Sequence, residues 1–166
     1  MQRTMSSEEL SSYIAKIKNP SDTFQRFLHD YVTGSPWIRS RGDEDVSVWN
    51  KLQGDELDVA KQIILDELQI IPDDSYMRAV SIFKDNRAIP ILMTLINTLS
   101  HIDLKLLAAK SLYDLTGYKD YVPMLENACK SQDMKLRSYL KYSIEVLFLP
   151  GLEESDKERI RKALSE

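Results

Sequence analysis

The stretch NRAIPIL, residues 86–92, decides the fold, because the chain repeats its outline as KDYVPML at residues 119–125, 33 residues further on. Each stretch is followed by a second apolar segment, and these segments start at Leu104 and Leu136, 32 residues apart. A period in this range is typical of stacked helical hairpins, in which a single pair of helices is too thin to bury its own apolar face. The repeat therefore predicts an all-α fold, a short α-solenoid of stacked antiparallel helical hairpins.

The two prolines within the repeated stretches support this prediction. Pro90 and Pro123 both fall in what the apolar pattern makes the first turn of a helix, where a missing N–H has no hydrogen bond to lose. Apolar residues at helical spacing extend the pattern on both sides. We expect one domain, residues 1–166, made of an N-terminal helical cap (1–53), about three hairpin repeats (54–148) and a C-terminal capping helix (152–166).

Helix ends can be placed from capping residues. Ser6 with Glu9 has the spacing of a capping box, and Ser21 is suited to cap the next helix, which Gly34 would end. Gly117 is a natural C-cap, and Ser155 with Glu158 predicts a capping box for the last helix. A short helix is expected within residues 43–52, with Trp49 on its core side.

The composition is that of a folded globular protein, with 43% hydrophobic and 29% charged residues. The longest apolar run, residues 89–99, is too short to span a bilayer and is interrupted by Thr94 and Asn97. The N-terminus lacks the apolar core of a signal peptide. A lone cysteine, Cys129, cannot form an internal disulfide and falls on an apolar helix face. These features predict a cytoplasmic protein with no membrane partner.

The net charge of −4 is unevenly placed. Basic and acidic groups balance in residues 1–53 and in residues 101–166, so the whole excess lies in residues 54–100. A nucleic-acid-binding protein would be expected to show the opposite imbalance. Two interpretations stay open: the carboxylates complement helix N-termini, or they form an acidic docking face for a partner with a basic patch. The candidate face contains Asp66, Glu67, Asp73, Asp74 and the nearby Arg78.

The repeated residues resemble the short bacterial HEAT-like repeats, including those named after phycobilisome lyases. Residues 85–90 (DNRAIP) match the phrase that opens the first helix of that family, and Leu104-Lys105 and Leu136-Arg137 match the start of its second helix. The third repeat departs from the pattern, with large residues at Tyr139 and Tyr142 where small ones are usual. The resemblance covers residues 54–148. It implies an α-solenoid in which the second helix of each hairpin lines the concave side. Most members of such families bind proteins, and others attach bilins or recognise damaged DNA.

Residues that carry chemistry are sparse. His29 and His101 have no neighbours that would complete a metal site, and Cys129 has no adjacent base or cation. The five glycines are scattered singly, so no glycine-rich phosphate loop is present. We therefore predict no catalytic residue, no cofactor and no metal, and a protein that is not an enzyme.

Candidate binding residues lie where the helical pattern leaves side chains off the core stripe. Trp37, in a loop with Pro36 and Arg39, either is an interface hot spot or folds back to plug the end of the stack. Tyrosines among charges on the second helices suit protein recognition, although an ordinary solvated face has the same composition. The candidates are Lys105, Lys110, Tyr113 and Asp114 in the middle repeat, and Arg137, Lys141, Tyr142 and Glu145 in the third.

Three functional hypotheses follow. The first is a non-catalytic protein-binding HEAT-like module, in its most specific form an immunity protein that neutralises a toxin through the acidic face. The second is a nucleic-acid-binding or DNA-repair-type HEAT-like enzyme, which would use the basic and aromatic residues of the second helices. The third is a structural subunit of a larger complex. The sequence leaves the partner and the oligomeric state open.

Overall fold

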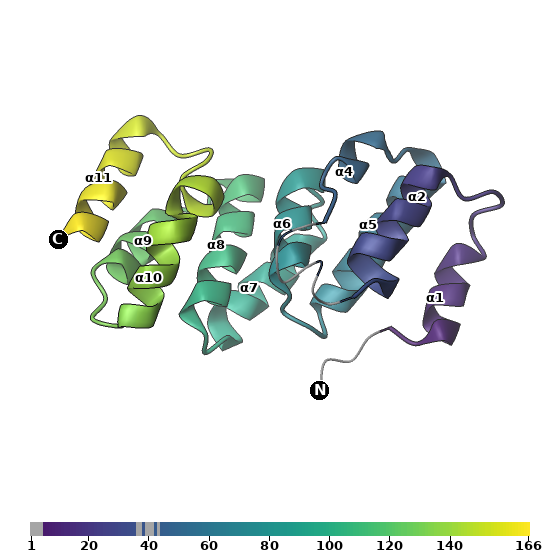
Figure 1. Ribbon diagram of the computed structural model, residues 1–166, viewed down its shortest axis with the longest axis horizontal. Helices are drawn as coiled ribbons and strands as arrows, with labels where there is room; N and C mark the ends of the chain where they lie inside the picture. The colour runs from purple at the N-terminus through teal and green to yellow at the C-terminus, as the bar shows by residue number, and fades with distance from the viewer. Residues whose placement is uncertain (1–4, 36–37, 39–41, 43) are drawn as a thin grey trace. The chain divides into compact units, whose positions relative to one another are not determined.

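The computed structural model describes residues 5–35, 38, 42 and 44–166, and it divides the chain into two compact units, unit 1 (residues 1–91) and unit 2 (residues 92–166). The described residues form helices joined by turns, without a strand (Figure 1). The all-α class predicted from the apolar spacing is confirmed. None of the described helices is long and apolar enough to cross a membrane.

Unit 1 is organised around one long helix, α5. Helices α1, α2 and α6 each pack against α5, and α4 packs against α2 and α6. The elements are α1 (Ser7–Ile14), α2 (Asp22–Phe27), the π-helix η1 (Leu28–Thr33), α4 (Val48–Lys51), α5 (Gly54–Leu68) and α6 (Asp74–Phe83), followed by α7 (Ala88–Thr98), which crosses the division between the units.

The first helices begin where the capping residues predicted. Ser6 and Glu9 form a capping box, in which the Ser6 hydroxyl accepts from the Glu9 N–H at 3.2 Å and the Glu9 carboxylate accepts from the Ser6 N–H at 2.8 Å. The Ser21 hydroxyl caps α2 by accepting from the N–H of Phe24 at 3.1 Å. Gly34 follows the last residue of η1. These three local predictions are confirmed.

An aromatic cluster forms the core of unit 1. The ring of Phe27 lies 5.7 Å from Phe24, 5.6 Å from Tyr31 and 5.3 Å from Trp49, measured between centroids. Trp49 also lies 4.9 Å from Phe83 and donates its indole N–H to the Tyr31 hydroxyl at 3.1 Å. The prediction that Trp49 belongs to the core is confirmed, since it is 5% exposed. Helices α2, η1 and α4 therefore share one core with α6.

A buried carboxylate lies next to this cluster, in the π-helix η1. Asp30 is 1% exposed and accepts hydrogen bonds from Arg26 Nε (3.0 Å), His29 Nδ1 (2.8 Å) and the backbone N–H of Asp45 (2.9 Å). Burial opposes ionisation of this carboxyl group, but the three hydrogen bonds outweigh burial and lower its pKa below the ordinary value of 3.8. Asp30 thereby ties the loop that precedes α4 to η1.

Unit 2 is built around α9, which packs against α8, α10 and α11. In Figure 1, α9 lies behind α10. The elements are the second part of α7, α8 (Ile102–Thr116), α9 (Tyr121–Cys129), α10 (Met134–Ser143), the π-helix η2 (Ile144–Phe148) and α11 (Glu154–Ser165). Tyr121 lies at the centre of the unit, fully buried, and donates its hydroxyl to the carbonyl of Phe148 at 2.7 Å.

The sequence repeat is visible in the helix boundaries. Pro90 is the third residue of α7 and Pro123 is the third residue of α9, so both lie in a first turn as predicted. Helices α8 and α10 start at Ile102 and Met134, which preserves the spacing of 32 residues. The repeats end differently: Gly117, with φ of 72°, terminates α8, whereas α10 continues into η2.

One detail of the boundary predictions is wrong. The last helix begins at Glu154 with Glu153 at the N-cap position, so Ser155 is inside the first turn and does not cap it. The short helix expected within residues 43–52 is present as α4, which covers 4 of those residues.

Candidate protein-binding surface

The acidic residues of unit 1 that were candidates for docking are held by intramolecular contacts. Asp66 accepts from the Tyr13 hydroxyl and from Gln62 Nε2, the latter at 2.8 Å. Burial together with this carboxylate raises the pKa of Tyr13 to about 12. Glu67 is 7% exposed and therefore lies in the interior of unit 1.

The remaining members of that candidate face organise the start of α6. Asp73 caps the helix by accepting from the N–H of Ser75 at 2.9 Å, as the helix-terminus interpretation expected. Asp74 pairs with Arg78 at 2.6 Å, and Arg78 also pairs with the buried carboxylate of Glu44. These side chains have a structural role in unit 1, and docking of a basic partner on them stays a prediction.

The candidates on α8 are only partly accessible. Lys110 is 7% exposed, and its ammonium group contacts both carboxylate oxygens of Asp114, at 2.5 and 2.6 Å. Lys105 is half-buried. Tyr113 is also half-buried, and its hydroxyl donates to the carbonyl of Gly151 at 3.4 Å. The interpretation of Lys110 as a side chain off the core stripe is corrected: its aliphatic stem is buried and its charge is neutralised within the same helix.

Two candidates on α10 and η2 attach this helical segment to α11. Arg137 donates to the carbonyl of Leu164 at 3.1 Å, near the C-terminus of α11. Glu145 accepts two hydrogen bonds from Arg161, at 2.7 and 2.8 Å. A bidentate carboxylate–guanidinium pair fixes orientation as well as distance. The segment is therefore held in place by both pairs, one near each of its ends.

The outward face of this segment carries a row of exposed side chains, which we call the docking strip: Met134, Ser138, Tyr142 and Val146. Successive members are four residues apart, which is the spacing of a ridge that runs obliquely along a helix, and the last member lies in η2. Met134 is 76% exposed, Tyr142 is 89% exposed and Val146 is 73% exposed. Large apolar side chains exposed to this extent, and in one row, are typical of interaction surfaces.

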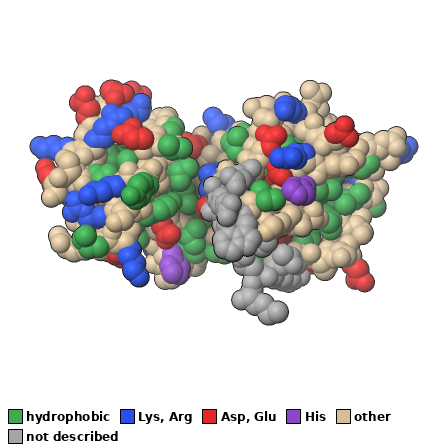
Figure 2. All heavy atoms as spheres, viewed as in Figure 1, with side chains coloured by type: hydrophobic (Ala, Val, Ile, Leu, Met, Phe, Trp, Pro, Cys, Tyr) green, Lys and Arg blue, Asp and Glu red, His purple; other side chains and the backbone are tan. Residues whose placement is uncertain are grey.

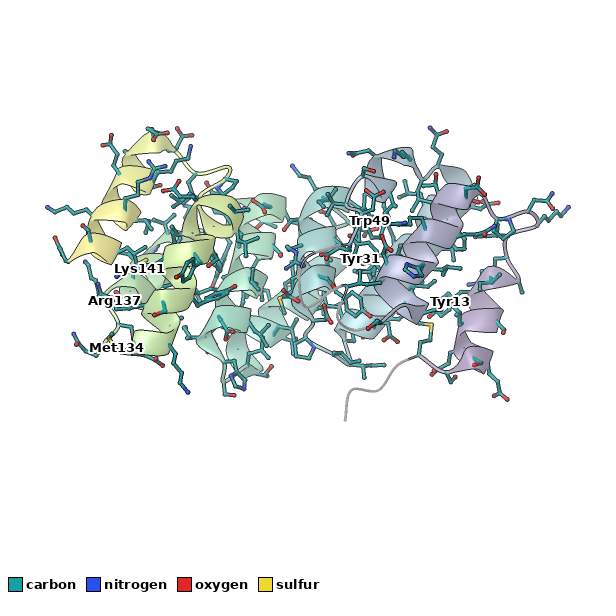
Figure 3. The ribbon with its side chains drawn as sticks, viewed as in Figure 1. Tyr13, Tyr31, Trp49, Met134, Arg137 and Lys141 are labelled. Atoms are coloured by element: carbon teal, nitrogen blue, oxygen red, sulfur yellow. The ribbon has the colours of Figure 1, made fainter. Side chains whose placement is uncertain are left out.

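Basic side chains border the docking strip. Lys135 and Lys141 are exposed on α10, and Arg137 is half-buried beside them. Figure 2 shows hydrophobic and basic side chains together on this face of unit 2, and in Figure 3 Met134, Arg137 and Lys141 follow one another along α10. Within the residues that the structure describes, Lys141 and Tyr142 have neither a hydrogen bond nor an ion pair, so both are available to a partner.

The middle of the equivalent row in the preceding repeat is covered. The residues 32 positions before Ser138 and Tyr142 are Leu106 and Lys110, which are 0% and 7% exposed, whereas Ile102, the equivalent of Met134, is 36% exposed. The two central positions of the row are therefore buried in α8 and open on α10.

Sequence reasoning identified part of this surface. Lys141 and Tyr142 were candidates, whereas Met134 and Val146 were missed because only charged and aromatic residues were considered. The available signal was the spacing itself: both residues fall outside the apolar stripe that contains Leu136 and Leu140.

The surface also contains two grooves whose linings combine acidic and basic side chains. A groove of about 660 Å³ in unit 1 is lined by Lys16, Asp55, Asp58, Val59, Gln62 and Arg87, with charges of both signs. A groove of about 450 Å³ in unit 2 is bounded by the start of α8, with His101 and Asp103, and by Lys135 and Tyr139 of α10. Among the described residues, no group of three or more potential ligands could hold a metal ion. Trp37 lies outside the described residues.

Compared with known proteins, the chain matches no protein-family model, no curated protein and no solved structure. The resemblance to HEAT-like repeats consequently stays a prediction that rests on the repeated residues.

Proposed function

We propose that this protein is a non-catalytic protein-binding module that contacts its partner through the docking strip. The observation that carries the proposal is the row of three large apolar side chains, each at least 73% exposed, on a helix fixed to its neighbour by Arg137 and Glu145. A helix that is already fixed in place has little backbone conformational entropy to lose when a partner covers it.

The chemistry of the strip favours a protein over a nucleic acid. Met134 and Val146 are aliphatic, and aliphatic side chains gain by packing against other apolar side chains, whereas nucleic acids are bound mainly through cations and aromatic stacking. The DNA-repair alternative needs an open basic groove with a free carboxylate. Lys110 is buried and Asp114 is paired with it, so two members of that groove are already engaged.

The geometry of the strip suits a partner helix. Four residues at intervals of four form the kind of ridge that packs into the groove of another helix. From Met134 to Val146 the ridge is about 18 Å long, since an α-helix rises about 1.5 Å per residue. A partner helix of three to four turns would cover it.

We also propose the short HEAT-like solenoid as the architecture behind this surface. The equal placement of Pro90 and Pro123 and the spacing of 32 between the starts of α8 and α10 support it. Toxin neutralisation, the most specific form of the binding hypothesis, would then use the strip, because Asp66, Asp73 and Asp74 have intramolecular partners.

Affinity capture from the native source, with three forms of the purified protein compared quantitatively, tests the proposal. The strip variant replaces Met134, Tyr142 and Val146 with serine, and the matched control replaces Ile70, an exposed aliphatic residue of unit 1 (52% exposed), with serine. We expect a stoichiometric partner for the wild type and the control, and loss of that partner for the strip variant. Equal capture by all three forms would show that the strip is not the binding surface. Salt-sensitive binding of duplex DNA, unchanged in the strip variant, would favour the nucleic-acid alternative.

A further inference from the structure

We propose that, in the absence of another protein, a second copy of this chain covers the docking strip by antiparallel, twofold pairing of the α10–η2 segments. This inference uses the same surface as the proposed function but goes beyond it, because the occupant is the chain itself. A twofold interface brings one surface against an identical one, so the surface must be complementary to itself when the order of its residues is reversed.

The apolar row meets this requirement about a centre at Leu140. Reversal about this centre places Met134 at the level of Val146 of the second copy. It also places Ser138 at the level of Tyr142 of the second copy. The small side chain of Ser138 leaves room for the phenol ring, and this happens twice in a symmetric pair. Large residues therefore meet medium or small ones, the combination that lets two helical ridges interdigitate.

The charges on the same face are also complementary under reversal. Lys135 and Glu145 are equidistant from Leu140, so Lys135 lies level with Glu145 of the second copy. Lys135 is exposed, and the carboxylate of Glu145 remains 56% exposed although it also binds Arg161. The other cations meet neutral residues: Lys141 lies level with Tyr139, and Arg137 lies level with Ser143. Like charges are not brought level with each other, and two opposite-charge pairs form.

The size of the interface sets the expected strength. A stable dimer commonly buries about 1,200–2,000 Å² in total, and one pair of short helical segments lies at or below the lower end of that range. We therefore expect a dissociation constant on the order of 1–100 µM, so that the monomer dominates in dilute solution and the dimer dominates at high concentration.

Sedimentation equilibrium of the full chain over a range from about 1 to about 300 µM tests this inference. The wild type should change from monomer to dimer. Lys135→Glu should raise the dissociation constant at least about tenfold, because each interface then has two carboxylates at one level. Glu145→Gln keeps a side-chain oxygen for Arg161 but removes the charge that meets Lys135, so it should raise the dissociation constant about threefold to tenfold. In the Lys135→Glu background the same change should lower the dissociation constant again, because it removes the like charges at that level.

The matched control is Lys141→Glu, the same change of charge on the same helix at a position level with a neutral residue, and it should shift the dissociation constant less than about threefold. Circular dichroism of each variant checks that the helices are retained. A wild type that is monomeric throughout overturns the inference and leaves the strip open for the partner of the proposed function. A dimer that Lys135→Glu weakens by the same factor whether residue 145 is glutamate or glutamine also overturns the antiparallel pairing.

Discussion

The ion pair between Lys110 and Asp114 offers a direct test of how the structure reassigns two candidate binding residues. In a partner-binding role, both side chains would be free in the isolated protein, and replacing Asp114 with asparagine would leave the stability of the fold unchanged. In the structure, both oxygens of Asp114 contact the Lys110 ammonium group. Asp114→Asn should therefore destabilise the protein, because it leaves a largely buried cation without a counter-charge.

The magnitude follows from the burial of the pair. Exposed ion pairs contribute about 0.2–1 kcal/mol, whereas removal of one partner from a buried pair costs about 3–5 kcal/mol. The side chain of Lys110 is 9% exposed and that of Asp114 is 19% exposed, so the pair lies between these limits. We expect Asp114→Asn to lower the free energy of unfolding by about 2 kcal/mol. Lys110→Met keeps an apolar side chain of similar length and leaves only Asp114, the more exposed of the two residues, without its partner. It should therefore lower the free energy of unfolding by about 1 kcal/mol or less.

Urea denaturation followed by circular dichroism, with hydrogen exchange of the α8 amides as a local readout, measures these values. The double variant K110M/D114N should be about as stable as K110M, which corresponds to a coupling energy of about 2 kcal/mol. A loss below about 0.5 kcal/mol for Asp114→Asn, with additive effects in the double variant, would show that the ion pair does not stabilise the fold. Lys110 would then be a solvated side chain that remains available for binding.

Three further predictions concern buried groups. Tyr121→Phe should lower the free energy of unfolding by about 1–3 kcal/mol, because the buried carbonyl of Phe148 loses its hydrogen-bond donor. Tyr142→Phe, at an exposed position, should change it by less than about 0.5 kcal/mol, and urea denaturation of both variants measures the difference. The pKa of Asp30 is lowered in the folded state, so the ionised carboxylate stabilises the fold above the ordinary pKa of 3.8, and this stabilisation is lost as the pH falls through the pKa of the folded protein. In acid titrations, the difference in unfolding free energy between the wild type and Asp30→Asn should therefore become smaller below about pH 4. Burial raises the pKa of Cys129 to about 11, so iodoacetamide at neutral pH should label it slowly in the folded protein and rapidly in urea; fast labelling of the native state would contradict the structure.

Local features of the fold were predictable because they depend on a few neighbouring residues. The capping box at Ser6, the cap at Ser21 and the C-cap at Gly117 each follow from the chemistry of one or two side chains. The placement of Pro90 and Pro123 is of the same kind, since proline is tolerated only in the first turn of a helix.

Features that depend on tertiary packing were only partly predictable. Helical spacing placed Lys110 and Tyr142 at equivalent positions, yet one is buried and the other is 89% exposed. The spacing identifies a face of the helix, but it does not reveal whether another element covers that face. A signal for the fate of Lys110 was nevertheless present, because Asp114 follows it at the spacing of four residues that favours an ion pair within a helix.

The π-helices η1 and η2 had no signal that simple sequence rules detect. Each follows directly on an α-helix, after Phe27 and after Ser143, and the apolar pattern continues across the junction. A π-turn widens the helix and rotates the residues that follow it, so a periodicity of 3.6 loses its register there.

Both proposals require the docking strip to lie outside the core of the protein, and hydroxyl-radical footprinting of the full chain at about 0.1 µM, below the expected range for dimerisation, measures this directly. Met134 should be oxidised much faster than the fully buried Met77, and Tyr142 much faster than the fully buried Tyr121. Rates for Met134 and Tyr142 as slow as those of Met77 and Tyr121 would mean that the strip is packed within the chain, and this result would contradict both proposals.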